Sequence, residues 1–355
     1  MFWGFCGLRQ WQGQYRQNLE IGGRDLKMFN VLYMCDDSFA PIAGISITSL
    51  FESHITAGVE ITVFLLEVNL SKKNKEKFLE LAEKYHQKIV LIDAAKALEE
   101  IEKLDIASYR GSAMTNLRLC FERFIPKYVE KLVYLDCDTL ICRPIAELMD
   151  FEMHGKLLGM VLDAYGAVLD QEAKRETVYY NAGVLLIDCK KWREEQWTKK
   201  IMSYIRDCGA QFSHPDQDIF NIVCENEIVR LPIEYNFQVV HRVYPDELVF
   251  RWLSPKQYYS ASEIEEARIN PGILHMVRIF GCNPWHKNNS HPDKEIFEKY
   301  KNISLWRDME MWMQPKDGLI LVEKLLYRIL PKSIFFPISL VGISKIQRFY
   351  KKNKY

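Results

Sequence analysis

The chain has 355 residues, of which 48% are hydrophobic and 26% charged, enough for one large folded domain with an appendage. Lysine plus arginine and aspartate plus glutamate both total 47, so charge gives no support for a nucleic-acid partner. The nine cysteines form no Cys-x-x-Cys pair and no secretory signal accompanies them, which indicates reduced thiols in the cytoplasm.

Residues 1–27 do not have the pattern of a targeting sequence. They mix Trp3 with polar residues such as Arg9, and no basic start precedes an apolar run. We expect a disordered leader, or the translation of an upstream start codon, before a folded domain over residues 28–306.

The first half of that domain alternates short apolar runs with helical patterns. Strands are predicted at Phe29–Met34, Ile61–Leu66, Lys88–Asp93 and Leu132–Leu135. Helices are predicted at Ala40–Phe51, after an N-cap at Ser71, and near Thr115–Phe124. Such alternation favours an α/β fold with a mixed, mainly parallel sheet and flanking helices.

The second half is more varied. Strands are predicted at Leu157–Leu162 and Ala182–Ile187, and helices at Cys189–Arg206 and Asp216–Val223. The stretch Val239–Gln257 is aromatic without a clear period, so we expect an irregular substrate-binding surface there.

Residues 307–355 form a small C-terminal region of different character. A helix with one apolar face is predicted from Gly318 until Pro331 stops it. The apolar run Ser333–Ser344 is shorter than the roughly 20 residues that a bilayer span needs. A basic and aromatic end follows: Lys345, Arg348, Phe349, Tyr350, Lys351, Lys352 and Lys354. We therefore expect peripheral contact with an anionic membrane surface.

The first chemical motif is Asp136-Cys137-Asp138, directly after the predicted strand Leu132–Leu135. Carboxylates at the carboxyl end of a parallel strand face the crevice where open α/β sheets bind ligands. They can hold a hard divalent cation, which in turn holds a diphosphate. Asp-x-Asp alone is usually a solvated turn, but the apolar strand before it favours the functional interpretation.

Three further polar groups each have a structural alternative. Asp36 and its neighbour after the first strand could bind a nucleobase or ribose, or could cap a helix. Asn181, followed by Ala182, offers a donor and an acceptor to a sugar hydroxyl, or opens a strand with a bulge. At Asp216-Gln217-Asp218, helix capping accounts for one acid but does not need all three polar residues.

His275 follows the apolar pair Ile273-Leu274. A lone histidine at a strand end is more often a core residue than a ligand. A neutral imidazole nevertheless suits a borderline metal such as Mn²⁺ beside two carboxylates.

The order of these motifs from about Phe29 to Trp306 resembles glycosyltransferase family 8, which contains glycogenin and bacterial lipopolysaccharide galactosyl- and glucosyltransferases. The resemblance includes YYNAGVLLID at Tyr179–Asp188, DQDxxN at Asp216–Asn221 and a later His291-Pro292. It implies a GT-A fold, a UDP-sugar donor, Mn²⁺ with Mg²⁺ as the alternative, and retention of anomeric configuration.

The resemblance also implies residue roles. The metal ligands are Asp136, Asp138 and His275. The donor site comprises Met34, Asp36, Ser38, Arg118, Asn181 and Ala182, together with Asp136 and Asp138. The catalytic side chains around the reacting sugar are Asp163, which matches an acid near the acceptor, and Asp216 and Gln217, which match the donor-sugar site. An amide is a poor nucleophile, so Gln217 favours front-face attack over double displacement.

One position departs from the family pattern His-x-x-Gly-x-x-Lys-Pro-Trp. Asn283 stands where the diphosphate-binding lysine is expected, and Gly281 comes later after His275 than in the family. A neutral amide cannot supply the lost charge, so Arg278 or Lys287 is expected to substitute.

We therefore predict a hexosyltransferase that takes glucose or galactose from a UDP-sugar. Its predicted acceptor is a glycan or lipid-linked glycan of a cell-surface polysaccharide, such as lipopolysaccharide or capsule. Its expected location is the inner face of the cytoplasmic membrane. An inactive sugar-nucleotide-binding homologue is the alternative that Asn283 raises. A nucleotidyltransferase would need a glycine-rich basic loop after the first strand, where Cys35-Asp36-Asp37-Ser38 stands instead.

Overall fold

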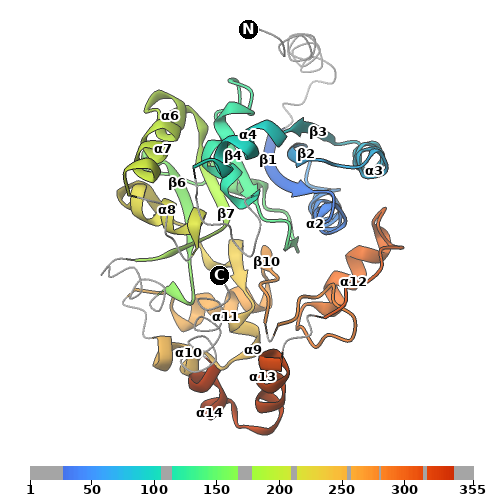
Figure 1. Ribbon diagram of the computed structural model, residues 1–355, viewed down its shortest axis with the longest axis vertical. Helices are drawn as coiled ribbons and strands as arrows, with labels where there is room; N and C mark the ends of the chain where they lie inside the picture. The colour runs from blue at the N-terminus through green and yellow to red at the C-terminus, as the bar shows by residue number, and fades with distance from the viewer. Residues whose placement is uncertain are drawn as a thin grey trace.

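The computed structural model describes residues 27–104, 114–166, 178–208, 214–253, 257–279, 281–314 and 318–339. The predicted leader, apart from Lys27, and the basic end from Lys345 lie outside these ranges. Two sheets organise the described chain, a large one of seven strands and a small one of three (Figure 1).

The large sheet has the strand order β3-β2-β1-β4-β7-β6-β8. Its strands are β1 (Lys27–Asp36), β2 (Val59–Val68), β3 (Lys88–Asp93), β4 (Lys131–Leu135), β6 (Leu158–Leu162), β7 (Tyr180–Asp188) and β8 (Ile228–Arg230). Strands β3, β2, β1 and β4 are parallel, whereas β7 runs antiparallel to both of its neighbours, β4 and β6. The predicted mixed, mainly parallel sheet is confirmed.

Helices cover both faces of this sheet because alternate strand residues point to opposite sides. Val31 and Tyr33 of β1 join a core cluster with helices α2 and α3, whereas Leu32 joins one with helices α4, α7 and α8. The bounds are α2 (Ala40–Ser53), α3 (Lys72–Lys84), α4 (Ala95–Glu102), α6 (Cys189–Glu194), α7 (Trp197–Cys208) and α8 (Pro215–Val223). As predicted, the Ser71 side chain caps α3 by accepting from the Asn74 N–H.

The small sheet lies beyond the carboxyl end of β4 and has the order β5-β10-β9. Its strands are β5 (Thr139–Ile141), β10 (Ile273–His275) and β9 (Phe237–Gln238). Short 3-10 helices lie at η2 (Met114–Arg123), η3 (Ala146–Asp150), η4 (Glu225–Glu227) and η5 (Ile233–Asn236).

Two predicted helices are interrupted. The segment near Thr115 is the 3-10 helix η2, with non-helical backbone angles at Cys120, and the Arg118 side chain donates to the Thr115 carbonyl. The long helix predicted at Cys189–Arg206 is divided into α6 and α7 by Gln196, whose φ is +56°. This turn lets both Trp192 and Trp197 be buried.

The irregular structure predicted for Val239–Gln257 is wrong, because the described part of this stretch contains α9 (Val240–Val243) and α10 (Asp246–Leu253), whereas its role as a substrate-binding surface stays a prediction. Pro245 separates the two helices and hides the helical period, while its carbonyl accepts the first amides of α10. The remaining helices are α11 (Ala261–Ile269), α12 (Lys294–Ile303), α13 (Gly318–Ile329) and α14 (Lys332–Pro337).

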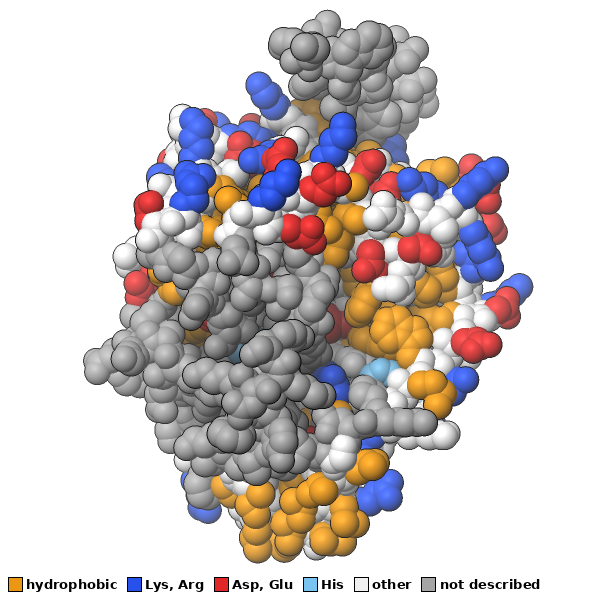
Figure 2. Space-filling view, viewed as in Figure 1, with side chains coloured by type: hydrophobic (Ala, Val, Ile, Leu, Met, Phe, Trp, Pro, Cys, Tyr) orange, Lys and Arg blue, Asp and Glu red, His pale blue; other side chains and the backbone are white. Residues whose placement is uncertain are grey.

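Helices α13 and α14 form a hairpin at the lower end of Figure 1. On its inner side, Phe335 and Phe336 are buried in a third core cluster with Ala164 and Ile279. On its outer side, six large apolar residues are between 39% and 64% exposed. They are Leu321, Val322, Leu325, Ile329, Ile334 and Ile338, and we call them the outer face of the hairpin. Figure 2 shows apolar side chains gathered at this end of the molecule.

Within the described ranges, we find no helix whose length and apolar character would suffice to cross a membrane.

Candidate active site

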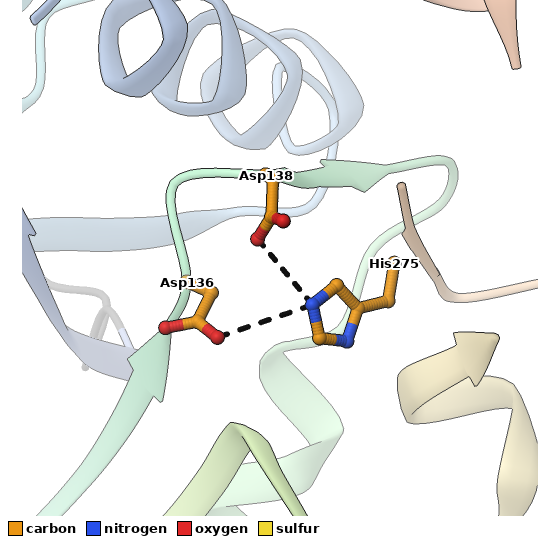
Figure 3. Close-up of side chains that lie close together, drawn as sticks. All are labelled: Asp136, Asp138 and His275. Carbon is orange, nitrogen blue, oxygen red and sulfur yellow. Dashed lines mark ion pairs between the residues drawn. The ribbon is translucent and has the colours of Figure 1, made fainter. Parts of the chain in front are cut away.

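The Asp136–Asp138 turn is where the chain passes from the large sheet to the small one. β4 ends at Leu135 and β5 begins at Thr139, whose hydroxyl donates to the Asp136 carbonyl at 2.8 Å. In the small sheet, His275 pairs with Thr139, so the antiparallel register brings the imidazole beside Asp138. Ligand atoms of Asp136, Asp138 and His275 all lie within 4.8 Å of one another (Figure 3).

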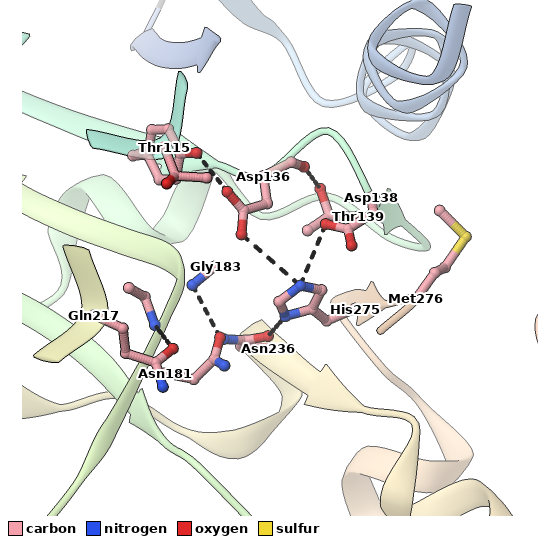
Figure 4. Close-up of polar contacts among 12 residues, drawn as sticks. Thr115, Asp136, Asp138, Thr139, Asn181, Gly183, Gln217, Asn236, His275 and Met276 are labelled. Carbon is pink, nitrogen blue, oxygen red and sulfur yellow. Dashed lines mark hydrogen bonds and ion pairs between the residues drawn. The ribbon is translucent and has the colours of Figure 1, made fainter. Parts of the chain in front are cut away.

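A chain of amide hydrogen bonds fixes the orientation of His275 (Figure 4). The Gly183 N–H donates to Asn181 Oδ1 at 2.9 Å, and the same oxygen accepts from Asn236 Nδ2 at 2.8 Å. Asn236 Oδ1 must then accept from His275 Nδ1, at 2.9 Å. The lone pair of a neutral His275 therefore lies on Nε2, which faces Asp138 at 3.3 Å and Asp136 at 3.9 Å.

Gly183 leaves the space that His275 occupies. A Cβ atom at this position would lie 2.2 Å from His275 Cε1 and 2.7 Å from Nδ1. The glycine of Asn-Ala-Gly thus admits the side chain of His275.

The electrostatics of the three side chains fit a cation. Burial raises the pKa of Asp136 even though the Arg118 guanidinium lowers it. Burial would lower the pKa of His275, but the carboxylates of Asp138 and Asp136 outweigh it and raise the pKa. Two carboxylates and an imidazole lone pair converging on one point suit a divalent metal ion. The described residues therefore fit the metal that the sequence motif implies.

Arg118 links the metal-binding turn to the adjacent polar residues. The side chain is 4% exposed, and its two terminal nitrogens donate to Asp136 Oδ1 and to the Ala182 carbonyl, both at 2.8 Å. Its Nε lies 3.2 Å from Asp216 Oδ2. Arg118, Asp136, Ala182 and Asp216, which the sequence analysis put in one site, are thus in contact.

A second group of predicted residues surrounds Asp163, just after β6. Asp163 Oδ2 accepts from Asn181 Nδ2 at 2.9 Å and from Gln217 Nε2 at 3.2 Å. Gln217 Oε1 accepts the Ala182 N–H at 3.0 Å. Because Asn181 also contacts Asn236, this group is continuous with the metal-binding cluster.

The loop after β1 is a hydrogen-bonded turn. Asp36 Oδ1 accepts from the Ser38 hydroxyl at 2.7 Å and from the Phe39 N–H at 2.9 Å, just before α2 begins. Phe39 is the N-cap residue of α2 and no side chain caps this helix, so the predicted capping role of Asp36 is wrong. The Met34 carbonyl accepts from the Cys137 thiol, which ties the loop to the Asp136–Asp138 turn.

The loop after His275 separates the remaining predicted residues. Asn283 is buried and its amide lies 3.4 Å from the Met276 carbonyl. Gly281 has a φ of +68° and packs under Ile320 of α13, where a Cβ would lie 2.4 Å from the isoleucine side chain. Lys287 is half exposed, 4.0 Å from Glu310. Which of Arg278 and Lys287 replaces the expected lysine stays a prediction.

Sequence reasoning missed Asn236 and Tyr134. Asn236 orients His275, and the Tyr134 hydroxyl donates to Asp136 while its ring lies 4.4 Å from the Arg118 guanidinium carbon. The sequence offered no clear signal for Asn236, because the run Ile233–Val240 also contains the polar residues Glu234 and Gln238.

The fold matches that of solved glycosyltransferases. The galactosyltransferase LgtC, solved with donor and acceptor sugar analogues, superposes with a TM-score of 0.66 at 20% identity, covering 79% of this chain and 99% of that chain. The architecture is thus of the GT-A type.

Sequence comparison gives the family. Residues 30–289 match the model of glycosyl transferase family 8. Lipopolysaccharide 1,2-glucosyltransferase of Escherichia coli is 25% identical over 311 residues, covering 83% of this chain and 86% of that protein. General stress protein A of Bacillus subtilis (strain 168) is 21% identical over 295 residues, covering 79% and 95%. The chain belongs to glycosyl transferase family 8, and it is a glycosyltransferase.

Proposed function

We propose that this chain is a retaining hexosyltransferase that moves glucose or galactose from a UDP-sugar to a glycan of a cell-surface polysaccharide, with Mn²⁺ as cofactor. The observation that carries the proposal is the convergence of Asp136, Asp138 and His275, with Arg118 bonded directly to one of them. A diphosphate leaving group needs such a cation, and this arrangement supplies its ligands.

Asp136, Asp138 and His275 would hold the metal ion, which when bound supplies Lewis-acid stabilisation of the diphosphate. Asn236 keeps the His275 lone pair directed at the carboxylates. Arg118 holds Asp136 and Asp216 in a fixed relation, so it connects the metal side of the site to the sugar side.

Asp163 and Gln217 are proposed to orient the reacting sugar. Both functional atoms of the Gln217 amide already contact the protein, at Asp163 and at the Ala182 N–H. An amide held in this way is a positioning group and not a nucleophile, which supports retention by front-face attack. Asp216, paired with Arg118, stands on the same side.

The substrate class is drawn from the relatives. The Escherichia coli relative is a lipopolysaccharide glucosyltransferase, whereas LgtC is a galactosyltransferase. UDP-glucose and UDP-galactose are therefore both candidate donors. A lipid-linked acceptor would place the enzyme at a membrane, and the outer face of the α13–α14 hairpin supports peripheral attachment there. Each lysine or arginine of the basic end, which follows the hairpin in sequence, would add about 1 kcal/mol of binding free energy near anionic lipid.

The test is UDP release from a panel of UDP-sugars, measured with Mn²⁺, with Mg²⁺ and with a chelator. We expect release from UDP-glucose or UDP-galactose that a chelator abolishes and Mn²⁺ restores. Binding of a UDP-sugar without any release, together with activation by Asn283→Lys, would instead support the inactive homologue. Release at full rate in the chelator would contradict the metal-dependent mechanism.

A further inference from the structure

A buried polar chain lies behind Asp163 and is not used by the mechanism above. His241 Nε2 is 2.8 Å from the Tyr258 hydroxyl, and His241 Nδ1 is 3.1 Å from Asp246 Oδ1. Asp246 is also ion-paired with Arg268 at 2.6 Å. The His241 side chain is fully buried and stacked between Phe237 and Tyr258.

The hydrogen bonds of this chain have a fixed direction. Burial would raise the pKa of Asp246, but hydrogen bonds from His241 and Arg268 outweigh it and lower the pKa, so Asp246 is a carboxylate that only accepts. His241 Nδ1 therefore donates to it, and in the neutral imidazole Nε2 is the acceptor. The Tyr258 hydroxyl must then donate to His241. Its oxygen retains lone pairs with which it can accept a hydrogen bond from another group.

The location of Tyr258 points to the reacting sugar's side of the site. Gln238, three residues before His241, accepts from the Ala164 N–H at 3.0 Å and so fixes this region against the segment that carries Asp163. Tyr258 packs against the core cluster that contains Ala164, the residue that follows Asp163. Part of the Tyr258 surface is exposed, unlike that of its neighbour Tyr259.

A phenol that accepts hydrogen bonds beside a carboxylate is suited to a sugar hydroxyl, which is a hydrogen-bond donor. The donor sugar already has Asn181, Asp216 and Gln217 as candidate partners, whereas Asp163 alone has so far been assigned a place near the acceptor. We propose that Tyr258 binds a hydroxyl of the acceptor saccharide, and that His241 and Asp246 position it for this contact. The inference rests on the proposed function, because it presupposes transfer to a sugar hydroxyl.

The experiment compares transfer with hydrolysis in Tyr258→Phe. This change removes the hydroxyl and keeps the ring, which packs edge-on against Phe250 and Tyr259. A panel of methyl glucosides and methyl galactosides serves as acceptor probes, and the glycoside with the highest transfer rate is used. We expect the KM for that glycoside to rise about 3–10-fold, as the loss of one hydrogen bond implies. Hydrolysis of the UDP-sugar without an acceptor should be unchanged.

Tyr259→Phe is the matched control. The Tyr259 hydroxyl donates to the Leu231 carbonyl at 2.6 Å and accepts from the Leu162 N–H, so its loss should lower Tm and leave the acceptor KM unchanged. Asp246→Asn should raise the acceptor KM as Tyr258→Phe does, and the double variant should show no further rise.

An acceptor KM in Tyr258→Phe equal to that of the unaltered chain, with transfer intact, would overturn the inference and leave the proposed function standing. An equal loss of transfer and of hydrolysis would also overturn it, because a general structural effect would explain both. An unaltered chain without transfer or hydrolysis would contradict the proposed function itself, and the inference with it.

Discussion

Gly183→Ala should disable the metal site although it replaces none of the proposed metal ligands. The added Cβ would lie 2.2 Å from His275 Cε1, whereas carbon atoms in contact are normally about 3.5–4.0 Å apart. The imidazole must therefore shift by more than about 1 Å, which disturbs its contacts with the Asn236 oxygen that orients it and with the two carboxylates. A displacement of about 1 Å in a catalytic site costs about 10²-fold in rate, or about 2.7 kcal/mol in activation free energy.

The assay is UDP release as a function of Mn²⁺ concentration. We expect kcat to fall about 10²-fold. The Mn²⁺ concentration for half-maximal rate should rise about 10–100-fold, because the shifted His275 loses the hydrogen bond that orients it as a metal ligand. Gly318→Ala, where nothing lies within 4 Å of the added carbon, is the matched control and should behave like the unaltered chain.

A double variant separates the proposed cause from general damage. If Gly183 acts through His275 alone, Gly183→Ala combined with His275→Ala should lose no more activity than His275→Ala by itself. Additive losses, or a Gly183→Ala variant with unchanged rate and unchanged Mn²⁺ response, would refute the reasoning.

The other predictions concern charge and surface. Asp138→Asn should lower kcat about 10²-fold or more, because it removes a metal ligand, and UDP release measured in parallel with a chelator checks this. Arg278→Ala should raise the KM for the UDP-sugar in steady-state assays, while Asn283→Lys should change it little. Flotation with phosphatidylglycerol liposomes should fail for a triple variant that replaces the outer face of the hairpin with serine: Leu321→Ser, Leu325→Ser and Ile329→Ser.

Each of these has a control or a contrary outcome. Full activity of Asp138→Asn in the chelator would contradict metal dependence. An unchanged KM for the UDP-sugar in Arg278→Ala would exclude that residue from the donor site. For the surface, Leu79→Ser replaces a leucine on α3 that is 48% exposed and should leave flotation unchanged. Equal flotation of the triple variant and the unaltered chain would exclude the outer face as the anchor.

The parallel part of the sheet could be predicted from the sequence because its strands are buried on both faces. Phe29–Met34 and Ile61–Leu66 are apolar except for Asn30 and Thr62, and charged residues appear only towards the ends of the two strands. The antiparallel insertion of β7 could not be predicted, since a strand buried on both faces reads the same in either direction.

The candidate site was predicted in part for a similar reason. Asp136 and Asp138 stand out because they directly follow an apolar strand, whereas the pattern alone favoured a core role for His275, and its role as a ligand came from the family resemblance; the structure brings the three side chains together. The chain of amides from Gly183 through Asn236 could not be predicted, because hydrogen-bond direction depends on a register between two sheets. The 3-10 helix η2 escaped prediction because the periods of a 3-10 helix and an α-helix differ little over a segment this short.

The inner side of the α13–α14 hairpin limits how this enzyme can be engineered. Trimming the chain at Gln314 would be the obvious way to obtain a form that stays off membranes and is easier to purify. It would also remove Phe335 and Phe336, which are almost completely buried in a cluster with Ala164 and Ile279. Ala164 follows Asp163 in the chain, and Ile279 belongs to the loop after His275. Each lost phenylalanine leaves a cavity that costs about 3–5 kcal/mol when the surroundings do not collapse. A shortened chain would therefore lose order beneath its own reaction centre, and solubility is better sought by substitutions on the outer face.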